Sequence, residues 1–300
     1  ALAGAPFLLG VINRVKSIFG GRQGPSLWQP YYDFRRLFAK GAVYSRTTSW
    51  VFRAGPIVLL AAMTCASLMM PFGNCPALLH FPGDFLVIAY LFGLARFMMV
   101  AAAMDTGSAF ENMGAAREVF FSALVEPAVL LCLAAVARKS LTGDPAPTSH
   151  LSLTDIHQHI SGQLWAESGL ILVFVAVALL VALLAETSRV PVDDPNTHLE
   201  LTMIHEVIVL DHSGVDLGMI LYGTALKLWL LASLIVGIVV PYTGFFGLDV
   251  LISLASVAAI AAIVGAVESG MARLRMVKVP QLLIGATALA ILALVLEYRV

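Results

Sequence analysis

The chain has 300 residues, 59% of them hydrophobic and only 12% charged, with a formal net charge of −1 and a mean hydropathy of +0.89. Soluble domains usually carry about 25% charged residues. Half that fraction, together with several apolar runs of about twenty residues, indicates an integral membrane protein. The near-neutral charge, without a basic tail or a basic patch with interleaved aromatic residues, argues against a nucleic-acid-binding protein.

The apolar runs predict a single all-α transmembrane domain over residues 1–300, a polytopic membrane protein of about eight helices, because helices of this length satisfy the backbone in lipid. The predicted spans lie near residues 1–13, 54–72, 84–104, 119–138, 166–186, 217–240, 249–268 and 280–297. The first run is too short to cross a hydrocarbon core about 30 Å thick at a rise of about 1.5 Å per residue. We therefore expect it to be the end of a helix that begins before Ala1.

Basic residues are concentrated in the loops on one side of the predicted bundle. Loops 14–53, 105–118, 187–216 and 269–279 contain thirteen Lys and Arg residues, whereas the other side has three, Arg138, Lys139 and Arg299. Loops rich in Lys and Arg stay in the cytoplasm. The sequence thus predicts a multi-pass protein of the cytoplasmic (inner) membrane, with the basic loop 14–53 and the acidic loop 187–216 inside and the C-terminus outside.

The basic loop is predicted to contain an amphipathic helix from Pro30 onward. Its apolar face consists of Tyr31, Phe34, Leu37 and Phe38, at helical spacing. Basic residues, among them Arg35 and Arg36, fall on the opposite face. The simpler interpretation is a helix lying on anionic lipid headgroups. The alternative is a docking surface for a soluble partner, formed by Arg22, Arg35 and Arg36 together with Arg189 of the acidic loop.

Three charged residues fall inside the predicted spans and away from their ends, namely Arg96, Glu126 and Lys227. A charge at mid-depth in a bilayer costs about 2.5–3.5 kcal/mol on insertion scales, so such a residue usually faces a partner or water. Arg96 and Lys227 could simply neutralise carboxylates, and Glu126 could be a buried neutral acid. Pro127 is expected to loosen the helix beside Glu126 and admit water. Several such residues in one chain favour an ion path.

The acidic loop follows a long apolar run and opens with AETSRVPVDDPNTHLEL, residues 185–201. Seven carboxylates and three histidines lie between Glu186 and Asp216. The candidate proton-relay residues are Glu126 in its span and, in this segment, Glu186, Asp193, His198, Glu200, His205 and Glu206. Histidine titrates nearest neutral pH, and neighbouring carboxylates can store or pass protons. This composition suits proton handling.

The same segment predicts an amphipathic helix that starts at Asp194-Pro195, as cap and first residue, and ends at Gly214. His198, His205 and His212 recur every seven residues and would form one stripe. Seven residues rise about 10.5 Å, too far for two of them to share a metal ion. The simpler interpretation is a solvated amphipathic helix with its histidines in water.

No motif predicts catalysis or a bound cofactor. Cys65, Cys75 and Cys132 are widely spaced and form no CxxC pair, so they do not supply ligands for zinc or an iron–sulfur cluster. The sequence has no nucleophile elbow, no GxGxxG after a strand and no P-loop. We therefore predict no catalytic residue, no metal site and no cofactor in this chain.

Several long segments match a known family. AETSRVPVDDPNTHLEL resembles AETNRAPFDLPEAESEL of the membrane subunit that joins the two arms of respiratory complex I. Continued through TMIHEVIVLDHSG, it is more similar to the paralogous subunit of group-4 membrane-bound [NiFe]-hydrogenases, the hydrogenase-4 and formate hydrogenlyase type. GRQGP, QPYYDFRRLFAKG, LARF, DTGSAFENMGAAREVFFSALVEP and MARLR agree with this resemblance. The matching segments span nearly the whole chain.

The resemblance implies eight transmembrane helices beside antiporter-like membrane subunits. It implies that the cytoplasmic loops support the hydrogenase large and small subunits and a ferredoxin-like iron–sulfur subunit, which would hold the NiFe centre and the [4Fe–4S] clusters. In complex I these loops wall a quinone cavity, from which carboxylates lead into the membrane. By motif match Glu186 and Glu126 correspond to two of those carboxylates, and Arg189, Asp193 and Glu200 keep their types.

Two departures favour the hydrogenase branch over quinone binding. Asn196 and His198 replace two carboxylates, and the first loop lacks an NRVGP element. The resulting hypothesis is a non-redox membrane subunit that anchors the hydrogenase module and couples electron transfer to proton or sodium translocation. The alternatives are a quinone-site subunit of a complex I-type oxidoreductase and a stand-alone ion transporter or structural anchor. A transporter would be expected to show an inverted repeat, which is not evident.

Overall fold

The structure is a computed structural model that describes residues 1–141, 152–193 and 204–297. Within these residues all regular structure is helical, apart from one isolated bridge between Phe72 and Cys75. The all-α prediction is therefore confirmed.

The helices follow the apolar runs of the sequence. In chain order they are α1 (Ala5–Phe19), α2 (Gln29–Phe38), α3 (Trp50–Met69), α4 (Asp84–Asp105), α5 (Ala109–Leu141), α6 (Leu153–Gln158), α7 (Gly162–Glu186), α8 (His205–Ile208), α9 (Gly214–Val239), α10 (Phe246–Gly270), the 3₁₀ turn η1 (Met276–Lys278) and α11 (Val279–Glu297). Seven of those described, α3, α4, α5, α7, α9, α10 and η1–α11, are long and apolar enough to cross a membrane. They correspond to seven of the eight predicted spans; α1, with 15 residues, is shorter.

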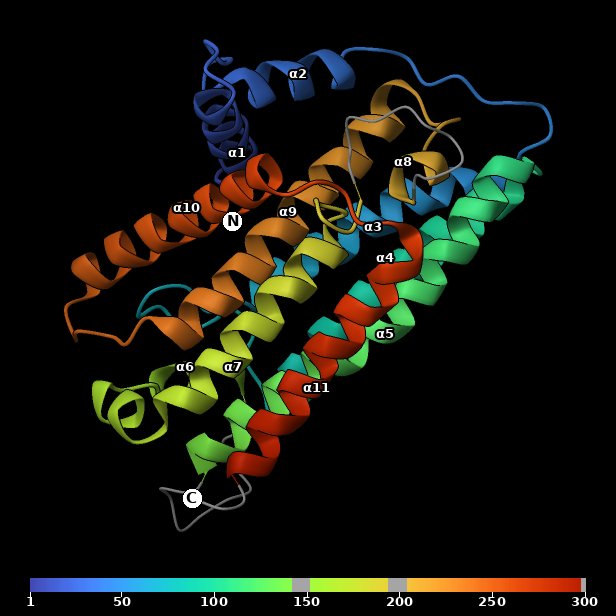
Figure 1. Cartoon of the computed structure of the whole chain (residues 1–300). Coiled ribbons are helices and arrows are strands. Elements are labelled where there is room, and N and C mark those ends of the chain that lie inside the picture. Colours follow the sequence, from blue (N-terminus) through green and yellow to red (C-terminus); the bar gives the residue numbers. More distant parts are fainter. Residues whose placement is uncertain (142–151, 194–203, 298–300) are drawn as a thin grey trace.

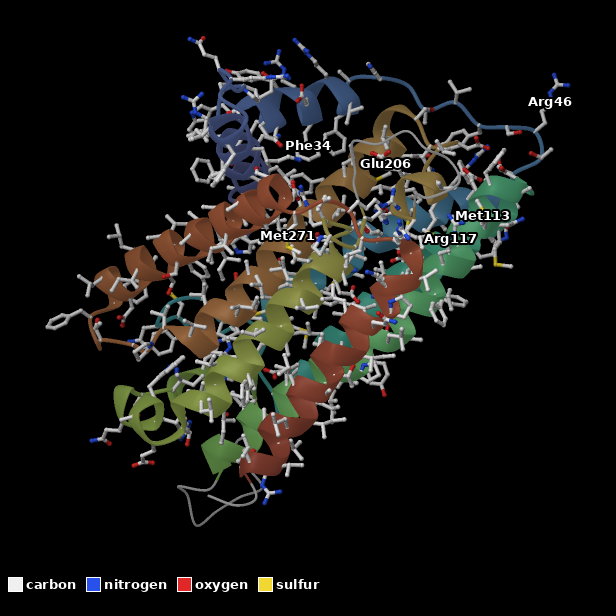
Figure 2. All side chains as sticks on the ribbon, viewed as in Figure 1. Phe34, Arg46, Met113, Arg117, Glu206 and Met271 are labelled. Carbon is white, nitrogen blue, oxygen red and sulfur yellow. The ribbon has the colours of Figure 1, made fainter. Side chains whose placement is uncertain are left out.

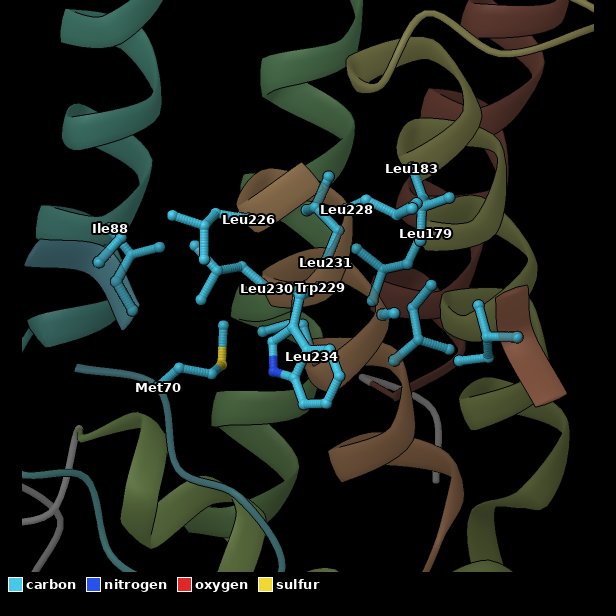
Figure 3. Close-up of a cluster of buried hydrophobic side chains, with 14 of the residues drawn as sticks. Met70, Ile88, Leu179, Leu183, Leu226, Leu228, Trp229, Leu230, Leu231 and Leu234 are labelled. Carbon is cyan, nitrogen blue, oxygen red and sulfur yellow. The ribbon is translucent and has the colours of Figure 1, made fainter. Parts of the chain in front are cut away.

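Helix α9 is the central element of the bundle (Figure 1). It contacts α1, α2, α3, α7 and α10, while α4 packs on α3 and α11 packs on both α5 and α7. The side chains through which α9 contacts its neighbours are rich in leucine, and Leu226, Leu228, Leu230, Leu231 and Leu234 are all buried. Figure 3 shows them with Trp229 among leucines of α7, Met70 and Ile88. The middle of the bundle between α9 and its neighbours is therefore a dense apolar core.

The two ends of the bundle differ in what their loops carry. Figure 1 shows α1, α2 and α8 at one end, which we call the α8 end, and α6 at the opposite end, which we call the α6 end. Figure 2 shows the labelled side chains of Arg46, Arg117 and Glu206 spread over the α8 end. The predicted basic and acidic loops therefore share one end of the molecule.

The predicted amphipathic helix of the basic loop is present as α2. Phe34 is its buried apolar residue and meets the ring of Tyr222 edge-on, with centroids 5.4 Å apart. The hydroxyl of Tyr31 donates to the carbonyl of Ala3 at 2.5 Å. Arg35 and Arg36 are exposed. The helix therefore packs on α1 and α9 with its apolar face and presents arginines outward.

Two predicted boundaries were wrong. α5 begins at Ala109, so most of the predicted loop 105–118 is helical. The polar first turns of α5 continue the helix because their charges find partners; for example, Glu111 accepts a hydrogen bond from the backbone of Asp211. Hydropathy alone does not detect a polar helix extension of this kind.

The predicted C-terminal end of the acidic-loop helix, at Gly214, was also wrong. Its described part, α8, ends at Ile208, and Gly214 instead begins α9 with a φ of +54°. A Cβ at Gly214 would lie 2.3 Å from the carbonyl oxygen of Gly41, so only glycine permits this contact between the basic loop and α9. The start of the predicted helix, including His198 and Glu200, lies outside the described residues.

Candidate functional site

Five charged side chains from four helices meet inside the bundle and form what we call the Arg96 cluster. Its members are Arg96 on α4, Glu118 and Glu126 on α5, Glu186 at the end of α7 and Lys227 on α9. The guanidinium of Arg96 donates through Nη2 to both carboxylate oxygens of Glu186, at 2.5 and 2.6 Å. Its Nη1 donates to Glu126, and its Nε lies 3.6 Å from Glu118 Oε1. Lys227 Nζ contacts the other side of the Glu186 carboxylate.

The cluster contains two cations and three carboxylates, so with all groups ionised it carries one net negative charge. Buried charges are tolerated only when they are paired and hydrogen-bonded, and every member here lies within 4 Å of an opposite charge. The excess carboxylate gives the cluster a place to hold one proton. This capacity distinguishes it from a neutral, purely structural ion pair.

Burial within the cluster changes from the centre to the side of the bundle. Glu186 has 5% of its side chain exposed, whereas Glu126 has 50% exposed. A cavity of about 140 Å³, which we call the lateral cavity, lies between α4 and α5 and is lined by Arg96, Glu126, Glu186 and apolar residues such as Tyr90. The cluster therefore extends from the core to the outer surface of α4 and α5.

A second, larger cavity of about 610 Å³ lies at the α8 end between α1, α2, α8 and α9. Its lining is largely apolar but includes Lys16, Asp33, Arg189, Asp193, His205, Glu206 and His212. A small inner pocket of about 30 Å³ is lined by Arg96, Glu118, Glu186 and Lys227 and also by His205. His205 thus borders both spaces, and within the described part of the chain its Nε2 is buried without a hydrogen-bond partner.

Further ion pairs hold the loops at the α8 end together. Glu268, in the last turn of α10, receives Lys16 at 2.8 Å and Arg189 at 3.1 Å. Arg273 Nη2 lies 2.8 Å from Asp193 Oδ1. These pairs connect α1, the segment after α7 and the α10–α11 loop.

The predicted site residues fall into three groups. Arg96, Glu126, Glu186 and Lys227 come together, and Asp193, His205 and Glu206 lie at the α8 end. Of the residues predicted to dock a partner, Arg22, Arg35 and Arg36 are exposed, whereas Arg189 contacts the buried Glu268 with 12% of its side chain exposed. His198 and Glu200 lie outside the described residues.

The histidine stripe is not continuous within the described residues. His205 borders the inner pocket, whereas His212 stacks on Phe52 with ring centroids 4.0 Å apart. Burial lowers the pKa of His212 from 6.5 to about 4, so its ring is neutral at neutral pH. His212 is therefore a packing residue, and of these two histidines only His205 faces the Arg96 cluster.

Sequence reasoning missed Glu118, because it placed the residue in a loop. The signal was nevertheless present: Glu118, Ser122 and Glu126 are spaced four residues apart and share one helix face. The described residues hold no group of three or more His, Cys, Asp or Glu side chains placed to bind a metal ion. The location of metal centres in partner subunits stays a prediction.

The fold and this site define a polytopic membrane protein with an ion-pair network inside its helix bundle. The chain belongs to the NADH dehydrogenase family, whose model matches residues 1–298. It is 29% identical to formate hydrogenlyase subunit 4 of Escherichia coli over 298 residues, 97% of this chain and 93% of that protein. It is 32% identical to hydrogenase-4 component C of the same organism over 132 residues, 44% of this chain and 42% of that protein.

A solved structure has the same fold. It is a chain of the membrane-bound sulfane sulfur reductase, an archaeal respiratory membrane complex, with a TM-score of 0.78 and 21% identity over 98% of this chain and 94% of that one. The family model and the two Escherichia coli relatives confirm the resemblance to this family of membrane subunits, and the solved structure shows that the fold is shared.

Proposed function

We propose that the chain is a non-redox membrane subunit of a multisubunit [NiFe]-hydrogenase complex that anchors the hydrogenase module and couples electron transfer to proton or sodium translocation. The observation that carries this proposal is the Arg96 cluster, which links the core of the bundle to its side and meets the large cavity at His205. The similarity to formate hydrogenlyase subunit 4 and hydrogenase-4 component C supports the hydrogenase branch.

The proposed route begins at the α8 end. A proton enters the large cavity, passes His205 to the inner pocket and is held among Glu118 and Glu186. A change in the charge or shape of a docked redox partner alters which carboxylate of the Arg96 cluster holds the proton. Adding or removing one charge changes the electrostatic free energy of a low-dielectric cluster by several kcal/mol. The proton then moves to Glu126 at the side of the bundle. Glu200, His198 and Glu206 would supply protons from the acidic loop.

The route is proposed to leave sideways into a neighbouring antiporter-like subunit. Toward the α6 end the buried leucines of α9, Leu230, Leu231 and Leu234, fill the space beyond Lys227 (Figure 3), and an apolar core of this kind offers no sites for a proton. In contrast, the α4–α5 surface around Glu126 exposes large apolar residues, including Tyr90 at 77% and Phe97 at 67%. A half-exposed carboxylate such as Glu126 is costly to expose to lipid at this depth, so we expect a polar group of a neighbouring subunit to face it.

The α8 end is proposed to dock the hydrogenase large and small subunits and a ferredoxin-like iron–sulfur subunit, through the exposed Arg22, Arg35 and Arg36. These partners would hold the NiFe centre and the [4Fe–4S] clusters. The Lys and Arg bias supports an orientation with this end in the cytoplasm, the chain in an inner membrane and the C-terminus outside. An impermeant thiol reagent should then label Phe245→Cys, at the α6 end, from outside intact cells; labelling only after lysis would reverse the topology.

The function is tested by replacing the two carboxylates that Arg96 bonds most closely. In the purified complex in vesicles, Glu186→Gln and Glu126→Gln should each reduce ion pumping at least about tenfold, as expected when a charge partner in a buried cluster is lost. Hydrogenase activity with an artificial electron donor should be unchanged. Glu167→Gln is the matched control, because Glu167 is an exposed carboxylate at the other end of α7. Full pumping by both cluster variants would overturn the relay.

The large cavity favours a second candidate, the quinone-site subunit of a complex I-type NADH or ferredoxin:quinone oxidoreductase. Its volume of about 610 Å³ and mainly apolar lining fit a ligand of drug size. Reduction of a soluble quinone analogue by the purified complex, blocked by cavity inhibitors, would support it. Copurification of a large subunit with paired CxxC nickel ligands would instead support the hydrogenase. Ion flux by this chain alone would indicate the stand-alone transporter.

A further inference from the structure

Helix α8 cannot hold its position by itself. It has only four residues, His205–Ile208, and isolated helices shorter than about 12 residues are marginal in water. Its outer side borders the large cavity and its inner side the inner pocket, both through His205. Whatever fixes α8 therefore determines where His205 stands between the two spaces.

Asp193 supplies the main polar support that the structure shows for α8. Its Oδ2 accepts hydrogen bonds from the backbone nitrogens of Ile204 at 3.0 Å and His205 at 3.1 Å, the cap and first residue of the helix. These are backbone donors that a helix leaves without an internal partner. A carboxylate at a helix N-terminus also complements the helix dipole.

The other oxygen of Asp193 ties α8 to the α10–α11 loop. Arg273 lies 2.8 Å from Oδ1, and the backbone nitrogen of Leu274 donates to the carbonyl of Pro191 at 3.0 Å. Asp193 is buried, with 2% of the residue exposed, and it lines the large cavity but not the inner pocket. Both oxygens of Asp193 are therefore engaged, and we call its contacts with the start of α8 and with Arg273 the Asp193 clamp.

We propose that Asp193 is a positioning residue rather than a proton carrier: together with Arg273 it holds α8 so that His205 stands between the large cavity and the inner pocket, beside the Arg96 cluster. The role in ion movement rests on the proposed function, whereas the clamp itself does not. When the clamp is lost, α8 opens, the barrier between the large cavity and the inner pocket is breached, and His205 no longer directs proton entry.

The clamp can be measured without reference to pumping. Val207 on α8 is fully buried, against the α5 backbone at Gly114. A Val207→Cys variant of the whole complex, with Cys65, Cys75 and Cys132 replaced by Ala, should react slowly with a water-soluble thiol reagent. Adding Asp193→Ala or Arg273→Gln should accelerate labelling about tenfold or more, because losing a cap or a buried ion pair raises the population of the locally open state.

The conservative variant separates the two roles of Asp193. In Asp193→Asn the amide oxygen can still accept both backbone hydrogen bonds, so labelling and pumping should lie between those of the unmodified residue and Asp193→Ala. A proton carrier would instead lose pumping equally in the Asn and Ala variants without any change in labelling. That result would overturn the proposal.

Two further measurements make the outcomes distinct. Hydrogenase activity with an artificial donor, retained in each variant, shows that the complex has assembled. If Glu186→Gln and Glu126→Gln both pump normally while Asp193→Ala still accelerates labelling, the proposed function fails and the clamp stands. If labelling is unchanged in Asp193→Ala and Arg273→Gln, the clamp fails whatever the pumping shows.

Discussion

At the scale of single residues, Arg96 organises the site because one guanidinium meets three carboxylates. Its planar fork bonds both oxygens of Glu186 and still reaches Glu118 and Glu126. A lysine ammonium is a single point charge and cannot span such a set. Lys227 contacts Glu186 from the other side, which leaves the carboxylates of α5 dependent on Arg96.

Arg96→Lys should therefore impair the site although it keeps the charge. The lysine would still meet Glu186 but would leave Glu118 and Glu126 unpaired, at a cost of about 1–3 kcal/mol in stability. Pumping should fall, and thermal inactivation of the solubilised complex should occur at a lower temperature. Arg46→Lys, in an exposed loop (Figure 2), is the control and should change neither quantity. An unaltered Arg96→Lys complex would show that the α5 carboxylates do not need the guanidinium.

His157 on α6 makes stability depend on pH. It is buried, neither ring nitrogen has a hydrogen-bond partner among the residues that the structure describes, and burial lowers its pKa from 6.5 to about 4. Because the folded-state pKa lies below the unfolded value, the unfolded chain gains the proton first as pH falls. Stability should therefore decrease from about pH 6.5 and be lower by about 3 kcal/mol below pH 4.

Thermal inactivation of the complex measured from pH 7.5 to 4.5 checks this dependence. His157→Leu should flatten the curve in this window and should not reduce stability at pH 7.5, since it removes polar atoms that have no partner. His80→Leu, at an exposed histidine of the same end, should leave the curve unchanged. An identical slope for His157→Leu and the unmodified chain would assign the acid sensitivity to other groups.

At the scale of elements, hydropathy predicted the long helices because their apolar runs are nearly uninterrupted, as in α7 and α10. It did not predict the first turns of α5, because the polar residues there are paired across the structure, as Glu111 is with Asp211. It also did not predict how α8 is held, because Asp193 supports the first residues of the helix through a contact that no local pattern reveals. Arg96, Glu126 and Lys227 could be predicted as a site because charge inside an apolar run is conspicuous, whereas Glu118 sits at the edge of one.

The junction between the basic loop and α9 depends on Gly214. Gly214→Ala would place a Cβ 2.3 Å from the carbonyl oxygen of Gly41 at a φ of +54°, and strain of this kind costs about 1–3 kcal/mol. The yield of assembled complex and its thermal stability should both drop. Gly162→Ala is the matched control, because Gly162 likewise begins a helix, α7, and its added Cβ would meet nothing within 4 Å. Equal behaviour of the two variants would show that the loop moves aside.

At the scale of the whole molecule, polar groups are unevenly distributed along the bundle. The large cavity, the inner pocket and the Arg96 cluster lie toward the α8 end, and beyond Lys227 the buried leucines Leu230, Leu231 and Leu234 of α9 lie toward the α6 end (Figure 3). A membrane protein that conducted ions by itself would need polar groups along its full depth. The arrangement instead favours a subunit that receives a change at one end and passes it on at its side, through Glu126.

Filling the lateral cavity tests this sideways exit. Gly93 on α4 lines the cavity, and a Cβ added there would lie 3.9 Å from Glu126 Oε1. Gly93→Leu should therefore occupy the space beside the carboxylate without a backbone clash, and in vesicles it should reduce pumping while hydrogenase activity with an artificial donor is kept. Gly285→Leu on α11, where an added Cβ meets nothing within 4 Å, controls for a larger apolar side chain on the bundle surface. Since the leucine adds volume but no charge, a loss confined to Gly93→Leu would assign the effect to access at Glu126, and normal pumping would mean that the proton does not leave by this side.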